Sequence, residues 1–520
     1  MSHATQDPWK TKEHLAFNPA DAKHQEHQKK TGKSMARERL DKILDPKSFQ
    51  ETDLLALSPF LDQPFYTDGV ITGFGTINNK KVAIYAQDFT LKGGSLGKRH
   101  AEKICKIMDL AAKIGCPIIG IIDSGGARID EGIHALAGYG QIFSRNVRYS
   151  GVIPQISLIL GPCAGGAAYS PALTDFVFMT KQISNMFITG PQVIKQALHQ
   201  EITMEELGGC SVHGPKSGVA HIITQTEDEA FEKLKSLLYL LPSNYLDTSH
   251  NNNTEQAQEF CRPILDPGSK ADLTNIVSNN MNKAYDMKHI ISHICDAHTF
   301  FEIQEIFAPN IITGLAKLDN KTVGIVANQP IIKAGTIDID ASVKAARFIR
   351  FCDSFDIPII SLVDVPGFLP GIDQEHHGII KHGAKLLYAY ASATVPKITV
   401  ILRKAFGGAY IVMGSKELGA DFNFAWPSAQ IAVLGASAAI TILHGKKIAL
   451  EPEETRAQTR YTLEKEYDQE FLNPFIAAQS GYIDAIIEPN MTRESLIKAL
   501  NITDNKIEHI PKKKHGNIPL

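Results

Sequence analysis

The chain has 520 residues, of which 43% are hydrophobic and 21% are charged, the balance of a soluble globular protein with large buried cores. Its net charge of -3 at pH 7 gives no electrostatic basis for nucleic-acid binding. Its apolar runs are short, whereas a membrane span needs about 20 apolar residues, so we expect neither nucleic acid nor a membrane as a partner.

The N-terminal stretch MSHATQDPWKTKEHLAF is polar and mixed in charge. It lacks the apolar run of a secretory signal and the Arg-rich bias of a transit peptide. Seven cysteines occur without a CxxC pair, which favours reduced, mostly buried thiols and argues against a zinc ribbon. We therefore expect a cytoplasmic protein without a bound metal. The cysteines are Cys105, Cys116, Cys163, Cys210, Cys261, Cys295 and Cys352.

Strand-like and helix-like segments alternate along the chain. In the first half a β-rich run, a segment with apolar residues at helical spacing and a largely apolar run follow one another, and the second half has the same order. Largely apolar runs of this length suit strands buried on both faces of a parallel sheet. The pattern predicts βαβ units and an α/β fold. The segments are Lys81–Ala86, Ala101–Ile114 and Pro117–Ile122, then Gly324–Ala327, Ser342–Phe355 and Pro358–Val363.

The two halves also share sequence. ITGFGTINNKKVAIYAQ begins at Ile71, and ITGLAKLDNKTVGIVANQ begins 241 positions later at Ile312. The same offset relates Asp123 to Asp364, and an offset of 242 relates the Gly-Gly-Ala sequence at 165–167 to that at 407–409. A period of this length indicates an internally duplicated domain rather than a solenoid of short repeats.

A polar, Asn-rich stretch without periodicity separates the halves at residues 243–258. It is typical of a linker or a surface loop. We therefore expect one domain over residues 10–250 and a second over residues 260–508, each of a size that one domain commonly has.

A pair of glycines follows a predicted strand in each half. Gly165 and Gly166 follow the run Ile156–Leu160, and Gly407 and Gly408 follow the corresponding run of the second half. Paired glycines between a strand and a helix let a ligand approach the backbone and leave N–H groups free at the start of the helix. Such N–H groups favour negative charge, so the pattern predicts two oxyanion holes.

Other motifs predict little chemistry. GGSLG from Gly93 matches the GxSxG elbow of hydrolases, but the polar stretch Gln87–Lys92 intervenes after the strand, which favours a plain loop. His293, Cys295 and His298 are interpreted as packing or surface residues rather than ligands, and the acid pair at 130–131 as solvated. The sequence thus offers backbone donors and no clear side-chain base.

Long motifs spread over nearly the whole chain resemble those of the acyl-CoA carboxyltransferases, the family of the propionyl-CoA carboxylase β subunit. The matching segments are ARERL from Ala36, QDFT from Gln87, GGSL from Gly93, DSGGARIDEG from Asp123, GVIPQISLILGPCAGGAAYSPA from Gly151, FITGPQVIK from Phe187, EELGG from Glu205, ANQP from Ala327, GTIDIDASVKAARFIRFCD from Gly335, VDVPGFLPG from Val363, GAKLLYAY from Gly383, FGGAYIVMGSK from Phe406, AWPSAQIAVLGA from Ala425 and KKHGNIPL from Lys513.

The resemblance implies two tandem crotonase-like domains of the ClpP/crotonase superfamily, each a β/β/α spiral. It implies that acyl-CoA binds mainly to the domain at 10–250 and biotin to the domain at 260–508. It also implies an active site between halves of two subunits in a hexamer of this chain. Biotin attachment usually needs a lysine between methionines, and no MKM sequence occurs here. The biotin carboxylase and biotin carboxyl carrier should therefore lie on another polypeptide.

The implied reaction moves CO2 from carboxybiotin to the α carbon of a short-chain acyl-CoA, propionyl-CoA or alternatively acetyl-CoA. By motif, Gly165 and Gly166 would hold the thioester oxygen, and Gly408 and Ala409 the biotin oxygen. In the family biotin itself removes the α proton, which agrees with the missing side-chain base. The substrate would also contact Gly125, Gly126, Gly367 and Ile411, the last at a position where propionyl-type members often carry an acidic residue.

Three alternatives stay open at the level of sequence. One is the carboxyltransferase of a biotin-dependent decarboxylase or transcarboxylase, which uses the same chemistry. Another is a crotonase-type enoyl-CoA hydratase or isomerase, which would need a positioned acid near the first glycine pair and no second pair. The third is a scaffold without catalytic activity.

Overall fold

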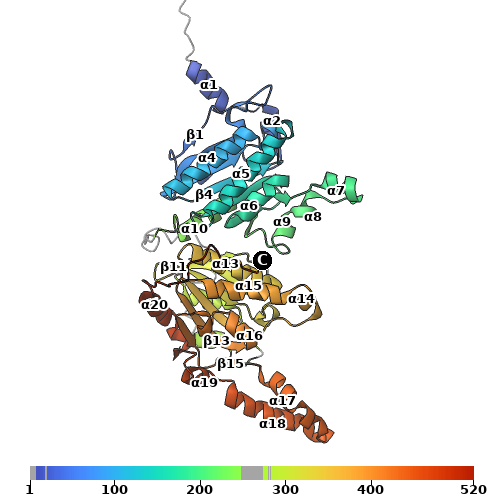
Figure 1. Ribbon diagram of the computed structural model, residues 1–520, viewed down its shortest axis with the longest axis vertical. Coiled ribbons are helices and arrows are strands. Elements are labelled where there is room, and N and C mark those ends of the chain that lie inside the picture. The colour runs from blue at the N-terminus through green and yellow to red at the C-terminus, as the bar shows by residue number, and fades with distance from the viewer. Residues whose placement is uncertain are drawn as a thin grey trace, which may run out of the picture. The chain divides into compact units, whose positions relative to one another are not determined.

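The computed structural model describes residues 8–17, 20, 22–247, 273–278, 280–281 and 283–519. The chain forms two compact units, Met1–His250 and Asn251–Leu520, which run from blue to green and from yellow-green to red in Figure 1. The predicted boundary and most of the predicted linker, residues 248–258, lie outside the described residues, as does Cys261.

Unit 1 has one eight-stranded sheet among its described residues. The first three strands pair antiparallel, and the later ones pair parallel. Every residue of β4 is buried, as a largely apolar run predicts for a strand covered on both faces. The order is β1 (Gln50–Thr52), β2 (Val70–Ile77), β3 (Lys80–Gln87), β4 (Ile118–Ser124), β5 (Gln155–Ala164), β6 (Phe176–Thr180) and β8 (Ile222–Thr224), with β7 (Asn185–Phe187) beside the end of β5.

Unit 2 has a sheet of the same order and pairing among its described residues, which confirms the predicted duplication. Its strands are β9 (Phe301–Ile303), β10 (Ile311–Leu318), β11 (Lys321–Asn328), β12 (Ile359–Val365), β13 (Lys397–Phe406), β14 (Phe422–Ala425) and β16 (Ala485–Ile486), with β15 (Gln430–Ala432) beside the end of β13. The six predicted segments are confirmed with shifts of a few residues at their ends. The most important shift is at the ends of β4 and β12, which extend beyond the predicted runs and include Asp123 and Asp364.

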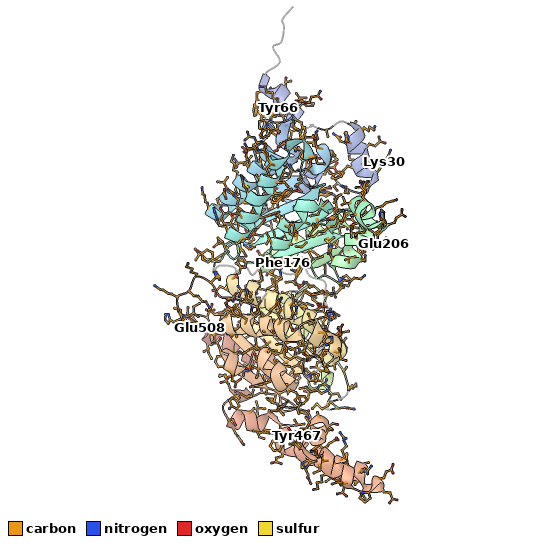
Figure 2. All side chains as sticks on the ribbon, turned by 45° about the vertical axis from the view of Figure 1, so that its right-hand side comes forward. Lys30, Tyr66, Phe176, Glu206, Tyr467 and Glu508 are labelled. Atoms are coloured by element: carbon orange, nitrogen blue, oxygen red, sulfur yellow. The ribbon has the colours of Figure 1, made fainter. Side chains whose placement is uncertain are left out.

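Helices cover both faces of each sheet, so that each unit is a three-layer α/β/α domain (Figure 1). In unit 1, α4 packs with α5 against one face, while α3 and α10 lie against the other. In unit 2 the corresponding pairs are α13 with α15 and α12 with α20. Two side chains labelled in Figure 2 illustrate this difference in burial: Phe176 of β6 is 2% exposed, whereas Lys30 at the end of α2 is exposed.

The helices of unit 1 are α1 (Pro8–Phe17), α2 (Ala22–Lys30), α3 (Ala36–Ile43), α4 (Lys98–Ile114), α5 (Ile133–Tyr149), α6 (Tyr169–Leu173), α7 (Pro191–Leu198), α8 (Met204–Gly208), α9 (Cys210–His213) and α10 (Glu227–Leu240). Those of unit 2 are α11 (Leu273–Ile276), α12 (Met287–Ile294), α13 (Ile339–Ser354), α14 (Ile372–His376), α15 (Ile379–Ser392), α16 (Gly407–Val412), α17 (Ala436–Leu450), α18 (Glu453–Phe471), α19 (Pro474–Gln479) and α20 (Thr492–Ile502).

The hydrophobic pattern explains the central helices. In α4 one stripe of residues is buried against the sheet, and Gly115 ends the helix in the left-handed conformation at φ 74°. The stripe comprises Ala101, Ile104, Ile107, Met108 and Ala111.

Among the described residues, no helix is long and apolar enough to cross a membrane. The six cysteines that the structure describes are buried free thiols.

Candidate functional site

Each glycine pair lies where a central strand turns into a helix. β5 ends at Ala164 and is followed by the short 3-10 helix η4 (Gly165–Ala168) and by α6. β13 ends at Phe406 and is followed by α16. The first glycine of each pair has a left-handed backbone, with φ 61° at Gly165 and φ 57° at Gly407. Glycine adopts this conformation without the steric cost that other residues meet, so it permits the sharp turn in both units.

The N–H groups after each turn are available donors. The first N–H groups of a helix have no acceptor within that helix. Within the described parts of the chain, no side chain caps η4 or α16. Negative charge is favoured at a helix start by these N–H groups and by the helix dipole. The turn can therefore stabilise an anion in each unit.

The structure brings the other predicted substrate residues next to these turns. A Cβ on Gly126 would lie 2.8 Å from the carbonyl oxygen of Ala164, so the Gly125–Gly126 loop lies against the end of β5. In unit 2 the residue after Gly367, Phe368, places its ring 3.9 Å from the Cβ position of Gly408. Gly125 is exposed, and the Cβ position of Gly367 has open space around it.

An aromatic ring supports each glycine pair, but from a different element. In unit 1 the ring of Tyr139 on α5 lies 2.9 Å from the Cβ position of Gly166. In unit 2 the ring of Phe368 lies between Gly408 and Gly383 of α15, with a distance of 3.1 Å to the Cβ position of Gly383. The first pair is therefore packed tightly against its ring, and the second pair more loosely.

Ala409 and Ile411 differ in their surroundings. Ala409 is buried, so its methyl group faces the core while its N–H belongs to the first turn of α16. Ile411, two residues later, is 41% exposed. In strict correspondence between the units, Gly166 and Ala167 match Gly408 and Ala409. Ala167 is thus a candidate donor that the sequence prediction omitted.

A buried carboxylate lies beneath the first turn. Asp123, at the end of β4, accepts hydrogen bonds from Lys33 Nζ at 2.9 Å and Arg39 Nη1 at 3.0 Å, and the Asp123 side chain has no exposed surface. Gln28 donates a further bond at 3.1 Å. Arg39 also binds Glu227 at 2.6 Å. Burial alone would lower the pKa of Arg39, but the two carboxylates together raise it above its usual value.

Unit 2 has a buried carboxylate at the same place with a different partner. Asp364 Oδ2 accepts bonds from Nε and Nη2 of Arg403, each at 3.0 Å, and Oδ1 accepts the N–H of Lys404 at 3.1 Å. The guanidinium of Arg403 lies 5.0 Å over the ring of Tyr285. Burial raises the pKa of Asp364, and the positive charge of Arg403 opposes that rise.

The acid pair at 130–131 departs from the prediction. Asp130 is exposed and pairs with Lys92 at 2.5 Å, as expected of a solvated residue. Glu131, expected to be solvated, has a fully buried side chain that accepts a bond from Arg128 at 2.8 Å and from the N–H of Lys98 at 2.6 Å. Its carboxylate lies at the start of α4, where a helix favours negative charge. The prediction was wrong for Glu131 because the sequence does not show that folding brings the N–H of Lys98 to its carboxylate.

The remaining motifs behave as plain structure. Ser95 of the GGSLG segment donates its hydroxyl to the carbonyl of Lys92 at 2.8 Å, within a turn that follows the 3-10 helix η2 (Lys92–Gly94). It does not extend from a strand, so this segment lacks the geometry of a nucleophile elbow. In the residues that the structure covers, no group of three or more His, Cys, Asp or Glu side chains could hold a metal ion, and the cluster at 293–298 is no exception.

Sequence reasoning missed the buried charges. The match between Asp123 and Asp364 was visible in the sequence, but it gave no role to these aspartates or to Arg39 and Arg403. One signal was present: an aspartate at the end of an apolar strand, repeated in both halves, is hard to bury without a cation. Which cation serves each aspartate could not be read from the sequence.

Comparison with known proteins gives one consistent result. The family model for the carboxyl transferase domain matches residues 27–518. The propionyl-CoA carboxylase beta chain of Saccharopolyspora erythraea is 52% identical over 94% of this chain and 91% of its own length. The methylmalonyl-CoA decarboxylase subunit alpha of Propionigenium modestum is 48% identical over 99% of this chain and 98% of its own. A solved structure of transcarboxylase 12S, a hexamer with methylmalonyl-coenzyme A bound, matches with a TM-score of 0.90 and 43% identity over 98% of each chain.

Proposed function

The chain belongs to the carboxyl transferase domain family, and from this premise we propose that it transfers the CO2 unit of carboxybiotin to the α carbon of propionyl-CoA. It is an enzyme, a carboxyltransferase, with the crotonase-like fold in two duplicated units. The observation that carries the proposed reaction is the uncapped helix start that follows the same strand in each unit, since carboxyl transfer develops negative charge at two centres.

Each glycine pair would serve one of these centres. The N–H groups of Gly165 and Gly166 would hold the thioester oxygen as it gains charge when the α proton leaves. Those of Gly408 and Ala409 would hold the ureido oxygen of biotin. Removing one donor of such a site typically costs about 2.7–4 kcal/mol of transition-state stabilisation. Gly125, Gly126 and Gly367 would shape the approach to the two turns.

The residues of unit 2 fit the biotin group. Gly408 is exposed at the start of α16, so a planar ring could approach its backbone. When bound there, carboxybiotin supplies the CO2 unit and then the base for the α proton. The protein's own part is to orient the two reactants and to hold the two charged oxygens.

Ile411 is the proposed contact for the acyl chain. It lies one turn into α16 from Gly408 and is 41% exposed. An apolar residue suits a short alkyl group, and one methylene more or less in such a pocket changes specificity by about 10–200-fold. Propionyl-CoA is therefore the first substrate to test, with acetyl-CoA as the comparison.

The same transfer run toward decarboxylation is the second candidate. It is favoured by the 48% identity to a methylmalonyl-CoA decarboxylase subunit over nearly the full length of both chains. The hydratase and scaffold alternatives receive no support, because each fails to account for the second uncapped glycine pair. Direction depends on the partner that supplies or removes CO2, and we propose a biotin carboxylase with a biotin carboxyl carrier on another polypeptide.

We also propose a hexamer of this chain in the cytoplasm. The transcarboxylase 12S match supports the hexamer. The described cysteines support a reducing compartment, since all six are buried as free thiols.

The test is the reverse reaction, with methylmalonyl-CoA or malonyl-CoA and free biotin. Biotin-dependent decarboxylation is expected, faster with methylmalonyl-CoA. Gly408→Val should reduce it about 100-fold or more, because the isopropyl group would cover the N–H donors proposed to hold the ureido oxygen. The backbone at Gly408 is ordinary and its Cβ position is 3.9 Å from the nearest atom, so the variant should fold. Gly445→Val on α17, where the Cβ position is open, is the control and should keep the wild-type rate. Wild-type protein without biotin-dependent turnover on either substrate would contradict the proposal.

A further inference from the structure

An irregularity in the sheet precedes each glycine pair. In unit 1, Ile122 pairs with Ile159 and Ser124 with Cys163, so the single residue Asp123 of β4 opposes three residues of β5. Unit 2 repeats this: Val363 pairs with Ile401 and Val365 with Ala405, so Asp364 opposes the three residues 402–404 of β13. Extra residues in one strand bend it and change where the following backbone points. Both bulges end three residues before the first glycine of the pair.

In unit 2 the opposing residue binds the bulge directly. The Asp364 carboxylate accepts the backbone N–H of Lys404 at 3.1 Å and two bonds from the side chain of Arg403 at 3.0 Å. Lys404 and Arg403 are both bulge residues. The carboxylate therefore fixes the backbone and one side chain of the bulge at once.

In unit 1 the opposing residue reaches the bulge through a second residue. The middle bulge residue is Gly161, and a Cβ there would overlap the Asp123 carboxylate. Arg39 instead bridges the two, with 3.0 Å from Nη1 to Asp123 and 2.7 Å from Nη2 to the carbonyl oxygen of Leu160, another bulge residue. Lys33 adds a second positive contact to Asp123 at 2.9 Å.

Each aspartate thus anchors both backbone segments of its turn. It lies at the end of the strand that continues into the Gly125–Gly126 or Gly367 loop, and it holds the bulge of the strand that leads into the glycine pair. An oxyanion hole acts only if its donors lie about 2.7–3.1 Å from the developing charge. Misplacement of catalytic groups by about 1 Å costs on the order of 100-fold in rate.

We propose that Asp364 with Arg403, and Asp123 with Arg39, are positioning residues that set the direction of the N–H groups of the second and the first glycine pair. The inference rests on the proposed function, in which the first pair serves the thioester oxygen and the second pair the ureido oxygen. It extends that function because it gives a catalytic consequence to charged side chains that are buried within each unit.

A purely structural role would predict something else. It would predict loss of stability with an unchanged rate for the molecules that stay folded.

The chain offers a matched control at the opposite end of the same strands. Asp421 accepts the N–H of Lys397 at 2.8 Å, at the start of β13, and Asp175 accepts the N–H of Gln155 at 2.8 Å, at the start of β5. Both are carboxylate-to-backbone bonds far along the strand from the glycines.

The experiment compares Asp364→Asn with Asp421→Asn, and Asp123→Asn with Asp175→Asn, in the full-length purified oligomer. The assay is methylmalonyl-CoA decarboxylation with free biotin. We expect kcat to fall about 10–100-fold in Asp364→Asn and Asp123→Asn, and to stay within about two-fold in the controls. The KM for biotin should change only in Asp364→Asn, and the KM for methylmalonyl-CoA only in Asp123→Asn.

Equal losses in Asp364→Asn and Asp421→Asn would overturn the proposal, as would a wild-type kcat in folded Asp364→Asn. If Asp364→Asn does not fold, Arg403→Lys replaces it, because it keeps the charge and loses one of the two bonds to Asp364. A kcat lowered about 3–10-fold supports the proposal, and a wild-type kcat overturns it. Wild-type protein without biotin-dependent turnover is a different result, since it would contradict the proposed function itself.

Discussion

In unit 1 the arginine that pairs with the buried aspartate at the end of the central strand lies on a helix, with Lys33 as a second cation, whereas in unit 2 the arginine lies on the neighbouring strand. Arg39 is the fourth residue of α3, and the fourth residue of the corresponding helix α12 is Ile290, a fully buried apolar residue. Arg403 is the seventh residue of β13, and the seventh residue of β5 is Gly161. The arginine thus comes from a different element in each unit, although the aspartate that it pairs with lies at the same place.

The aromatic support shows the same kind of exchange. Tyr139 on α5 packs against Gly166 in unit 1, where the residue after Gly126 is the small Ala127. In unit 2 the residue after Gly367 is Phe368, and Gly383 on α15 leaves room for its ring. In each unit one large residue and one small residue fill the same space. A duplicated domain can thus retain a geometry while the residues that produce it move between elements.

The fourth residue of the helix, Arg39 in α3 and Ile290 in α12, should be required as a cation in unit 1 and as an apolar residue in unit 2. Of the changes predicted here, Arg39→Met should lower the free energy of unfolding the most. It leaves Glu227 without its closest cation and removes one of two from Asp123. Breaking a buried ion pair costs about 3–5 kcal/mol of unfolding free energy. Ile290→Met at the corresponding position should cost less than about 1.5 kcal/mol.

Thermal unfolding of both variants, with Lys42→Met as the control, measures the difference. Lys42 also lies on α3, and its ion pair with Asp228 is exposed, so this change should alter stability by less than about 1 kcal/mol. If Arg39→Met and Ile290→Met lowered the thermal midpoint by similar amounts, the positive charge of Arg39 would not contribute to stability beyond the packing of its side chain.

The glycine pairs give a second, smaller contrast. Gly166→Ala brings a Cβ to 2.9 Å from the Tyr139 ring, whereas Gly408→Ala leaves 3.9 Å to Phe368. Overpacking a tight site costs about 1–3 kcal/mol, so Gly166→Ala should lower the thermal midpoint and Gly408→Ala should not. The matched double variant Gly166→Ala with Tyr139→Leu removes the contact and should recover part of the loss. Equal midpoints for the two single variants would contradict the packing difference.

One buried histidine of unit 1 should make stability sensitive to acid, and unit 2 has no histidine at the corresponding position. His100 is fully buried, and burial, with Arg128 and Lys103 nearby, lowers its pKa well below 6.5. Its counterpart at the same offset is Ala341. Below pH 6.5 the unfolded chain takes up a proton that folded His100 does not, so stability falls as the pH falls, by about 1 kcal/mol per unit. Above pH 6.5 both states are neutral and the effect vanishes.

The measurement is the thermal midpoint at pH 7.0 and 5.5 for wild type, His100→Gln and the exposed control His376→Gln. The fall between the two pH values should shrink in His100→Gln and stay as in wild type in the control. A fall of the same size in all three proteins would show that His100 does not carry the acid sensitivity.

The smallest predicted effect concerns the turn before the central helix. Gly93 and Ala334 occupy the same position, and both are left-handed, at φ 63° and φ 54°. A residue with a Cβ meets a cost of about 1–2 kcal/mol in this conformation, offset in part by the greater flexibility of unfolded glycine. Ala334→Gly should therefore stabilise the protein slightly, by less than about 1 kcal/mol, and Gly93→Ala should destabilise it. A midpoint lowered by Ala334→Gly would contradict this reading of the backbone.

Much of the fold was accessible from the sequence because duplicated patterns reinforce one another. The apolar runs before Asp123 and Asp364 predicted buried parallel strands, and the matched glycine pairs predicted turns at the ends of β5 and β13. The repeats could not show that Glu131 is buried at the start of α4. Its partner Arg128 is only three positions away in the sequence, but Ser58 and Lys98 are brought to it by folding.

The sequence by itself determined the α/β class, the duplication and the positions of the two glycine turns, because these depend on local spacing, on backbone conformation and on residue matches along one chain. Only the tertiary structure decided which cation neutralises each buried aspartate and which ring supports each glycine pair. Those choices depend on residues far apart in the sequence, 84 positions for Arg39 and Asp123 and 39 positions for Arg403 and Asp364. A compensated exchange between two elements leaves no local pattern from which it could be predicted.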